Sequence, residues 1–372
     1  MRKAVVILPT YNEEGNIERL VDLIFAEQKN APNWELHILV VDSNSTDNTE
    51  ANLKKLVKKL PRLHLMKVEK EGLGKAYVNG FKNALQTIQP FVIFEMDADL
   101  SHDSKEIPEF LKEIEKGADF VIGSRYIRGG SIPSNWGLHR KFLSVFGNII
   151  IRLGFMKLSI SDWTGGFRAI KAWIVKDSLE HIKNYSGYVF QVALLDYAIN
   201  HGARVKEIPI NFSDRTVGVS KINAAQYSLH SLMYVFNHSS FIKYIIVGSS
   251  GFLVDSFLLY VGYHIFRLDV KVAKVISAET AILSNFLLNN FWAFSHKQLE
   301  HKLEVYAGKF LKFNLVSVPS IIIQTIGIVV LTAVFGKYLF YPIGYNVLIV
   351  AFIVIPYSYF MYNRFIWKKK NS

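Results

Sequence analysis

The sequence of 372 residues contains no cysteine, so it can form neither a disulfide bond nor a metal site with thiolate ligands. It also shows no signal-peptide pattern at its start, because an apolar run typical of a strand, Ala4–Leu8, follows the first residues directly. We therefore expect the N-terminal region to stay on the side of a membrane on which it is synthesised.

Acidic residues are the minority charge: 31 aspartates and glutamates stand against 43 lysines and arginines, for a net charge of +12. Such a balance is typical of proteins that bind nucleic acid or the anionic surface of a membrane. Many of the positive residues flank long hydrophobic segments, as at the cytoplasmic ends of membrane helices. We therefore predict that the membrane is a partner of this chain and that nucleic acid is not.

The first part of the chain alternates short apolar runs with amphipathic stretches. The spacing of Ile17, Leu20, Val21 and Ile24 predicts a helix, and so does that of Leu53, Leu56, Val57 and Leu60 after Asp47. Continuous apolar strands between helices are typical of a parallel sheet covered on both faces, which binds ligands at the carboxyl ends of its strands. The predicted strands are Ala4–Leu8, Leu36–Val41, Leu63–Val68, Phe91–Met96 and Phe120–Ile122.

The last part of the chain is dominated by apolar segments, each long enough to cross about 30 Å of hydrocarbon. We predict an α/β catalytic domain over residues 1–222, a linker helix over 223–243, and an all-α transmembrane domain of four helices over 244–372. The predicted spans are about 244–266, 272–294, 310–335 and 342–367.

The positive residues also predict an orientation. Lysines and arginines gather in the polar break Ser295–Gly308 and at the C-terminus, whereas fewer lie between the first two spans. With four spans, these two regions share a side with the N-terminal domain, and the more positive side faces the cytoplasm. We therefore predict an integral membrane protein whose catalytic domain and C-terminus are cytoplasmic.

Two further stretches, Phe142–Phe155 and Ala224–His238, combine apolar residues with flanking charges or moderate polarity. Each is compatible with an amphipathic helix lying in the membrane interface or with an ordinary helix packed on the catalytic domain.

Polar motifs follow three of the predicted strands. Tyr11 and Glu13 come after the first strand, where Tyr11 could stack on a base or ribose, or the motif could form only a turn and helix cap. Asp42 ends the second strand, and the polar residues after it could merely cap the next helix. We expect both functions, with Asp42 accepting hydrogen bonds from a nucleotide and Thr46 or Asp47 capping the helix.

The third motif is Asp97-Ala98-Asp99, directly after Phe91–Met96. Two carboxylates at alternate positions of a strand end can bind a divalent cation such as Mg²⁺ or Mn²⁺ together with phosphate oxygens. The cation would neutralise a departing diphosphate. The same pattern also occurs in surface turns, but its place after a buried strand favours a metal site.

Together these motifs resemble glycosyltransferase family 2 with its GT-A fold, a Rossmann-like, mostly parallel sheet with helices on both faces. The string Asp97–His102, with Gly72–Ala76, Gly123–Tyr126 and Gly165–Arg168, looks like dolichol-phosphate mannose synthases and their polyprenyl-phosphate relatives. The resemblance covers the chain through residue 221. One departure is that Ser101 stands where that family has a glutamine beside the metal.

The resemblance implies roles for individual residues. Those of the metal site are Asp97, Asp99 and Ser101, and those implied in catalysis are Asp99, Arg125 and Arg215. The acceptor phosphate would meet Arg125, Arg140 and Ser144, since guanidinium groups suit phosphate oxygens. Residues implied in binding the donor nucleotide sugar are Pro9, Tyr11, Glu13, Val40, Asp42, Asp97, Ala98, Asp99, Arg215 and Lys221. The competing interpretation of any single arginine or lysine is a solvated surface charge.

We therefore expect an inverting enzyme that moves a hexose from a nucleotide sugar to a polyprenyl phosphate, with GDP-mannose as first choice and UDP-glucose as second. The four-helix segment resembles the GtrA-like family, for which we expect an anchoring role. A processive polysaccharide synthase would need an Arg-Trp pair that the sequence lacks. A sugar-lipid flippase with a regulatory N-terminal domain is the alternative from another class. The roles of Asp255 and Glu279, inside predicted spans, are left open, as are those of Asp162 and Gln191.

Overall fold

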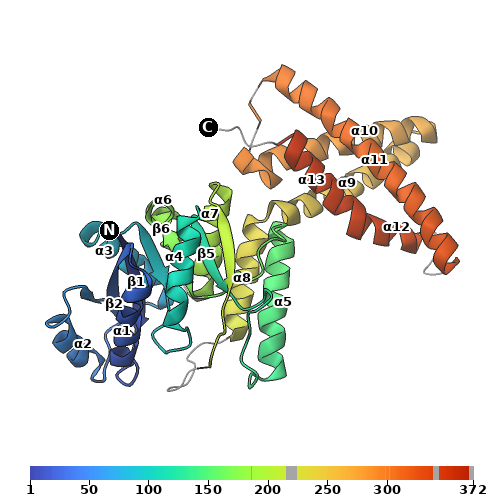
Figure 1. Ribbon diagram of the computed structural model, residues 1–372. Coiled ribbons are helices and arrows are strands. Elements are labelled where there is room, and N and C mark those ends of the chain that lie inside the picture. Colours follow the sequence, from blue (N-terminus) through green and yellow to red (C-terminus); the bar gives the residue numbers. More distant parts are fainter. Residues whose placement is uncertain (186, 215–223, 298, 301, 338–342, 368–372) are drawn as a thin grey trace. The chain divides into compact units, whose positions relative to one another are not determined.

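The computed structural model divides the chain into two compact units, Met1–Asn237 and His238–Ser372. It describes residues 1–185, 187–214, 224–297, 299–300, 302–337 and 343–367. The division falls within the segment 223–243 that the sequence sets apart as a linker. Figure 1 shows the elements of both units, which are described separately below.

The first unit is built on a seven-stranded sheet with the order β3-β2-β1-β4-β6-β5-β7. Only β6 runs antiparallel to its neighbours β4 and β5. The mostly parallel sheet expected from the apolar runs is thereby confirmed. The strands are β1 Arg2–Thr10, β2 Trp34–Asp42, β3 Leu63–Lys67, β4 Val92–Glu95, β5 Phe120–Ser124, β6 Arg168–Lys171 and β7 Val205–Pro209.

Helices cover both faces of this sheet (Figure 1). On one face, the buried residues of α1 and α4 join alternate residues of β1, β2 and β4 in one apolar cluster. On the other face α3 approaches closely, since a Cβ at Gly80 would lie 2.9 Å from the side chains of Ile7 and Val41. The helices of this unit are α1 Ile17–Ala26, α2 Thr49–Val57, α3 Leu73–Thr87, α4 Ile107–Glu115, α5 Leu138–Phe155, α6 Ala172–Ile182, α7 Gly187–Asn200 and α8 Ala224–His238.

The parallel pairing brings the carboxyl ends of the central strands to one edge. Thr10, the last residue of β1, is paired with Asp42, the last residue of β2, and Ile7 of β1 is paired with Glu95, the last residue of β4. Because parallel strands end at the same edge, the polar motifs after β1, β2 and β4 are gathered there.

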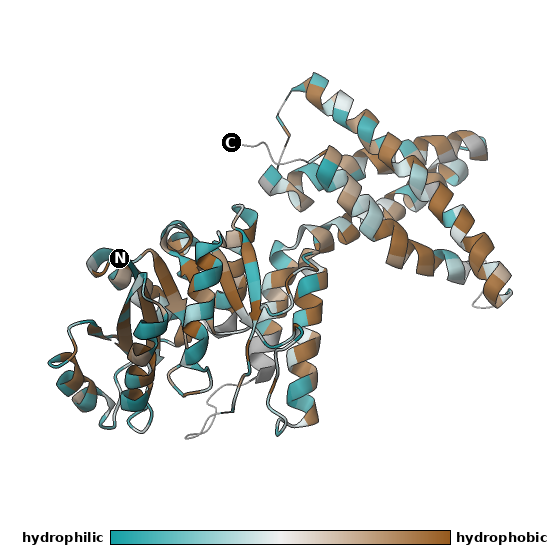
Figure 2. Ribbon diagram, viewed as in Figure 1, coloured by the Kyte–Doolittle hydropathy of each residue, from teal (hydrophilic) through white to brown (hydrophobic). Residues whose placement is uncertain are grey.

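The second unit is helical, as expected for the C-terminal part of the chain. Apolar residues dominate α11 and α12, as Figure 2 shows. Its elements are α9 Ser240–Tyr260, α10 Val270–Leu288, α11 Leu303–Phe335, α12 Ile343–Ile349 and α13 Ile355–Phe365, with π-helical turns at Val261–Ile265, Asn289–Ala293 and Val350–Val354 and a short turn at Ser295–Lys297.

Three helical segments of the described residues are long and apolar enough to cross a membrane: Ser240–Ile265, Leu303–Phe335 and Gly344–Phe365. The expected span 272–294 is also helical, as α10 and the π-helical turn after it, but it does not reach that criterion. Its charged residues Lys271, Lys274 and Glu279 lower the hydropathy. The helix expected from Phe310 begins seven residues earlier, at Leu303, so that Glu304 and Gly308, expected in the polar break, lie inside α11.

Helices α9 and α10 pack closely as an antiparallel pair. A Cβ at Gly251 would lie 2.3 Å from the amide group of Asn285, and one at Gly262 would lie 3.1 Å from Ala273 Cβ. Between these positions the hydroxyl of Ser277 donates a hydrogen bond to Asp255 Oδ1 at 2.7 Å. Small residues at such contacts let the backbones approach, as is typical of helix pairs in membranes.

Candidate active site

The ends of β1 and β2 form one wall of the candidate site. The Asp42 carboxylate is completely buried and accepts hydrogen bonds from the hydroxyl of Thr10 (3.3 Å) and from the backbone N–H of Ser45 (3.1 Å). The Ser45 hydroxyl also lies 2.5 Å from Asp42 Oδ1. Asp42 therefore shapes the turn after β2.

The donor-binding residues expected on these two strands differ in exposure. Pro9, Tyr11 and Glu13 are half-buried at the end of β1, and Lys70 Nζ lies 3.4 Å from the centre of the Tyr11 ring. Glu13 Oε2 accepts a hydrogen bond from the Asn16 side chain. Val40 lies inside β2 with its side chain completely buried in the core, so only its backbone could meet a ligand.

The loop after β4 carries the paired carboxylates. Asp97 keeps a third of its side chain exposed, and its Oδ2 lies 3.5 Å from Nε2 of the buried His102. Asp99 is 5 % exposed and its Oδ1 accepts a hydrogen bond from the Ser101 backbone at 3.1 Å. Ala98 between them is buried. Leu100 has a φ of 62°, in the left-handed region that side chains rarely adopt. Backbone strain of this kind clusters at functional sites.

The donor atoms of this loop fit a hard divalent cation. Ser101 Oγ is buried and has no hydrogen-bond partner among the described residues. The two ring nitrogens of His102 likewise form no hydrogen bond there. Orphaned buried polar atoms of this kind call for a ligand or a catalytic role. Within the described ranges, no three His, Asp or Glu side chains are close enough to hold a metal alone. Two carboxylates and a hydroxyl would therefore share the ion with phosphate oxygens, as is usual for Mg²⁺.

Two consecutive glycines lie against the carboxylate loop. A Cβ at Gly166 would lie 3.3 Å from Gln191 Nε2, 3.5 Å from Asp97 Oδ2 and 3.6 Å from His102 Nε2. A Cβ at Gly165 would lie 3.3 Å from Asp162 Cγ. Gly165 therefore lies beside Asp162, and the next residue, Gly166, lies beside Asp97.

Arg168 is hydrogen-bonded to the backbone around this glycine pair. Its completely buried guanidinium donates hydrogen bonds to the carbonyls of Trp163 (2.7 Å), Gly165 (2.8 Å) and Gln191 (2.8 Å). Its Nε also lies 3.8 Å from Glu95 Oε2. Burial raises the pKa of Glu95 to about 7, against the opposing attraction of Arg168.

Arg125 is held by Asp162, which lies beside Gly165. The guanidinium donates to Asp162 through Nε (2.7 Å) and Nη2 (2.8 Å), and the Arg125 backbone N–H donates to the same carboxylate. Burial alone would raise the pKa of Asp162, but the charge and hydrogen bonds of Arg125 lower the pKa below its usual value. Arg125 is thus paired within the protein and is no solvated surface charge.

The other residues expected at the acceptor phosphate lie on α5. Arg140 is partly exposed, lies 3.9 Å above the Trp136 ring and 3.5 Å from Asp214. The hydroxyl of Ser144 lies 2.5 Å from that of Tyr126, the residue after Arg125. The structure therefore brings Ser144 and Arg125 into one neighbourhood. Arg215 and Lys221 lie outside the described residues. The chain before them adjoins the carboxylate loop, because Ser213 donates its N–H to the Ser101 carbonyl at 3.1 Å.

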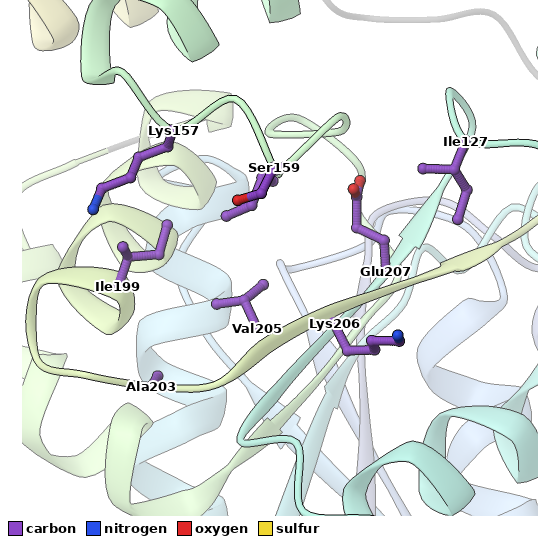
Figure 3. Close-up of a pocket in the computed structure, with 9 residues that line it drawn as sticks. Ile127, Lys157, Ser159, Ile199, Ala203, Val205, Lys206 and Glu207 are labelled. Atoms are coloured by element: carbon purple, nitrogen blue, oxygen red, sulfur yellow. The ribbon is translucent and has the colours of Figure 1, made fainter. Parts of the chain in front are cut away.

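A cavity of about 510 Å³ opens at the edge strand β7, and none of the residues predicted for the site is among those that line it (Figure 3). Ile127, Ser159, Val205 and Glu207 are among the residues that line it. None of these residues was expected in the site, because a single sequence does not show that Glu207 lies near the partner of Arg125 in space.

Two regions of the chain match known families. Residues 5–179 match glycosyl transferase family 2, and residues 243–367 match the GtrA/DPMS transmembrane domain. The chain is 30% identical over 333 residues to the dolichol-phosphate mannosyltransferase of Pyrococcus furiosus, a match that covers 87% of this chain and 89% of that protein.

Two further proteins are similar over about three fifths of the chain. The polyprenol monophosphomannose synthase of Mycolicibacterium smegmatis is 38% identical over 226 residues, 60% of this chain and 82% of that protein. The undecaprenyl-phosphate mannosyltransferase of Micrococcus luteus is 35% identical over 223 residues, 59% of this chain and 88% of that protein.

Proposed function

This chain belongs to glycosyl transferase family 2, together with its polyprenyl-phosphate mannosyltransferase relatives, and from that premise we propose that it transfers mannose from GDP-mannose to a polyprenyl phosphate. The proposed product is a mannosyl lipid phosphate with inverted, β configuration. The flippase and processive-synthase alternatives find no support in the relatives, which are named as mannosyltransferases.

The observation that carries this proposal is that two adjacent glycines, Gly166 and Gly165, lie beside Asp97 and beside Asp162, the partner of Arg125. An enzyme that joins a sugar from a diphosphate donor to a phosphate acceptor must hold two anions close together. A cation-binding loop beside a fixed arginine supports that arrangement.

The donor side of the site consists of Tyr11, Glu13 and Asp42 at the ends of β1 and β2, with Asp97 and Asp99 after β4. We propose that the two aspartates and Ser101 hold Mg²⁺ or Mn²⁺, which when bound neutralises the charge of the leaving diphosphate. Asp99 is already oriented for this role by the Ser101 backbone N–H. Tyr11 would stack on the nucleoside, and Arg215 and Lys221 stay predictions for the diphosphate.

The acceptor side needs no strong general base, because a phosphate monoester is an anion at neutral pH. Arg125, Arg140 and Ser144 would bind and orient its oxygens. The charge of Arg125 is balanced by Asp162, so Arg125 contributes directed hydrogen bonds more than net attraction. Positioning of the two substrates and stabilisation of charge would then supply most of the rate enhancement.

The second unit makes this an integral membrane protein, as its match to the GtrA/DPMS transmembrane domain and its apolar helices indicate. We propose that α5 adds a contact to the membrane surface. Phe142, Phe146 and Leu153 share one side of this helix and are 62%, 46% and 50% exposed. An exposed apolar stripe on an otherwise folded domain suits the headgroup region of a bilayer. The proposed side of the membrane is the cytoplasmic one.

The test of the donor uses membranes that contain the chain, supplied with polyprenyl phosphate and with radiolabelled GDP-mannose or UDP-glucose in turn. We expect label in the lipid extract from GDP-mannose and little from UDP-glucose. Label from UDP-glucose alone would overturn the choice of donor, and label from neither would overturn the proposed activity.

A further inference from the structure

The loop Ser161–Thr164 is hydrogen-bonded to Arg125, to strand β7 and to helix α5. The inference drawn from it rests on the proposed function. The loop follows α5 and leads to the glycine pair beside Asp97. Its Asp162 holds both Nε and Nη2 of Arg125, and the Thr164 hydroxyl accepts a further bond from Arg125 Nη2 at 3.0 Å. The direction of the Arg125 guanidinium therefore depends on where this loop lies.

Glu207 anchors the loop from the edge strand β7. Its two carboxylate oxygens accept hydrogen bonds from the backbone N–H groups of Ser161 and Asp162, both at 2.9 Å. In Figure 3 the Glu207 carboxylate points away from β7, beside the cavity that Ser159 and Ile127 also line. One carboxylate thus satisfies two successive backbone donors, which fixes the loop at the residue that binds Arg125.

Asn148 anchors the loop from α5. The side chain is 3 % exposed, and its Oδ1 accepts a hydrogen bond from the Trp163 N–H at 2.7 Å. Its amide donates to the Thr164 hydroxyl (3.1 Å) and to the Ser144 carbonyl (2.8 Å). Ser144 is itself one of the residues expected at the acceptor phosphate. Asn148 therefore joins the helix that carries Ser144 to the loop that holds Arg125.

We propose that Asp162, Glu207 and Asn148 are positioning residues that together set the distance and direction of Arg125 relative to Ser144 and so form a frame for the acceptor's phosphate group. None of the three needs to touch the substrate. Their effect passes through Arg125, whose hydrogen-bonding directions they fix, and through α5.

This frame lies apart from the donor-binding residues at the ends of β1 and β2, although its loop leads to the glycine pair beside Asp97. Tyr11, Glu13 and Asp42 lie at the ends of β1 and β2, and in the described part of the chain none of them is hydrogen-bonded to Asp162, Glu207 or Asn148. Loss of a hydrogen bond in the frame should therefore raise the KM for the lipid acceptor and leave the KM for the nucleotide sugar nearly unchanged. A merely structural role would instead lower the amount of active enzyme and alter neither KM.

The experiment compares the full-length enzyme with three variants in detergent micelles. Glu207→Gln keeps the shape of the side chain but replaces one acceptor oxygen by a donor that faces a backbone N–H. Asp162→Asn does the same to the group that holds Arg125. Glu180→Gln on α6, where the side chain is 81% exposed and paired only with Lys183 in the described structure, is the matched control.

For each variant, KM is measured for polyprenyl phosphate at saturating GDP-mannose, and then for GDP-mannose at saturating acceptor. We expect the KM for polyprenyl phosphate to rise at least threefold in Glu207→Gln and at least tenfold in Asp162→Asn. The KM for GDP-mannose should change by less than twofold, and Glu180→Gln should match the unaltered enzyme in both.

Equal changes in both KM values, or no change in either for Glu207→Gln, would overturn the frame. If Asp162→Asn does not fold, Glu207→Gln decides by the same criterion. Failure of the proposed function has a different signature, because the unaltered enzyme would then transfer no mannose to polyprenyl phosphate at all. In that case the affinity for polyprenyl phosphate is measured without donor for Glu207→Gln and for the unaltered enzyme. Equal affinities would overturn the frame.

Discussion

Asp196 on α7 offers a sharp test of the energetics of the first unit, because its carboxyl group is buried and both of its hydrogen-bond donors are neutral. It accepts hydrogen bonds from the Tyr234 hydroxyl of α8 (3.2 Å) and from the Asn200 amide (2.9 Å), and it is 7 % exposed. Burial raises the pKa of Asp196 from 3.8 to about 6, against the opposing effect of these two hydrogen bonds. The native state therefore keeps its proton at a pH where the unfolded chain has lost it.

The sign of the pH dependence follows from this difference. Between pH 3.8 and about 6 the native state binds more protons than the unfolded state, so the free energy of unfolding falls as the pH rises. Above about pH 6 both states are ionised and the loss is complete. A difference of about two pKa units corresponds to about 3 kcal/mol, which is the destabilisation that ionised Asp196 causes at pH 7.

The perturbation is Asp196→Asn, which keeps the shape and the capacity for hydrogen bonds but does not ionise. We expect the variant to gain stability relative to the unaltered chain as the pH rises from 4 to 7, by up to about 3 kcal/mol. This corresponds to a difference in Tm of roughly 6–12 °C for a unit of this size. The assay is thermal unfolding of the full chain in detergent at a series of pH values. A constant difference between the two proteins over this range would refute the reasoning.

Three other predictions address the site and the membrane unit. Arg168→Met leaves three carbonyls and Glu95 without their buried partner, so unfolding of the first unit should become easier by about 3–5 kcal/mol, as thermal unfolding in detergent can show. Asp97→Asn should weaken binding of GDP at least tenfold in Mn²⁺ but not in EDTA, as titration calorimetry can measure, and equal loss in both would contradict a metal-linked role. Single cysteines at positions 268 and 295, on a chain with none of its own, should react with an impermeant thiol reagent from opposite sides of the membrane if α10 crosses it. Reaction from the same side would show that it does not.

Much of the sheet could be predicted because its inner strands are continuous apolar runs. The expected strands at Leu36–Val41 and Leu63–Val68 correspond to β2 and β3 within a residue or two. In contrast, β6 was not expected, since Arg168–Lys171 is short, begins with a buried arginine and pairs antiparallel with strands that are distant in sequence. Tertiary contacts and not local pattern determine that strand.

The limits of prediction were similar in the site and in the membrane unit. Asp97, Asp99 and Arg125 could be found because motifs after strands gather at one sheet edge. The positioning roles proposed for Asp162, Glu207 and Asn148 could not, because they depend on hydrogen bonds between segments far apart in the chain. The early start of α11 at Leu303 was missed because Glu304, Gly308 and Lys309 resemble a loop in a hydropathy profile, although glutamate and lysine are good helix formers.

The central claim is that the carboxylate loop after β4 and the arginine held beside it serve the transfer of mannose to a lipid phosphate. It is tested most directly by supplying the purified chain and its Asp99→Asn variant with polyprenyl phosphate, Mn²⁺ and radiolabelled GDP-mannose, and counting label extracted with the lipid. We expect labelled lipid from the unaltered chain, none when EDTA is added, and a loss of at least a hundredfold in the variant. Equal labelling by both proteins, or labelling that survives EDTA, would contradict the account.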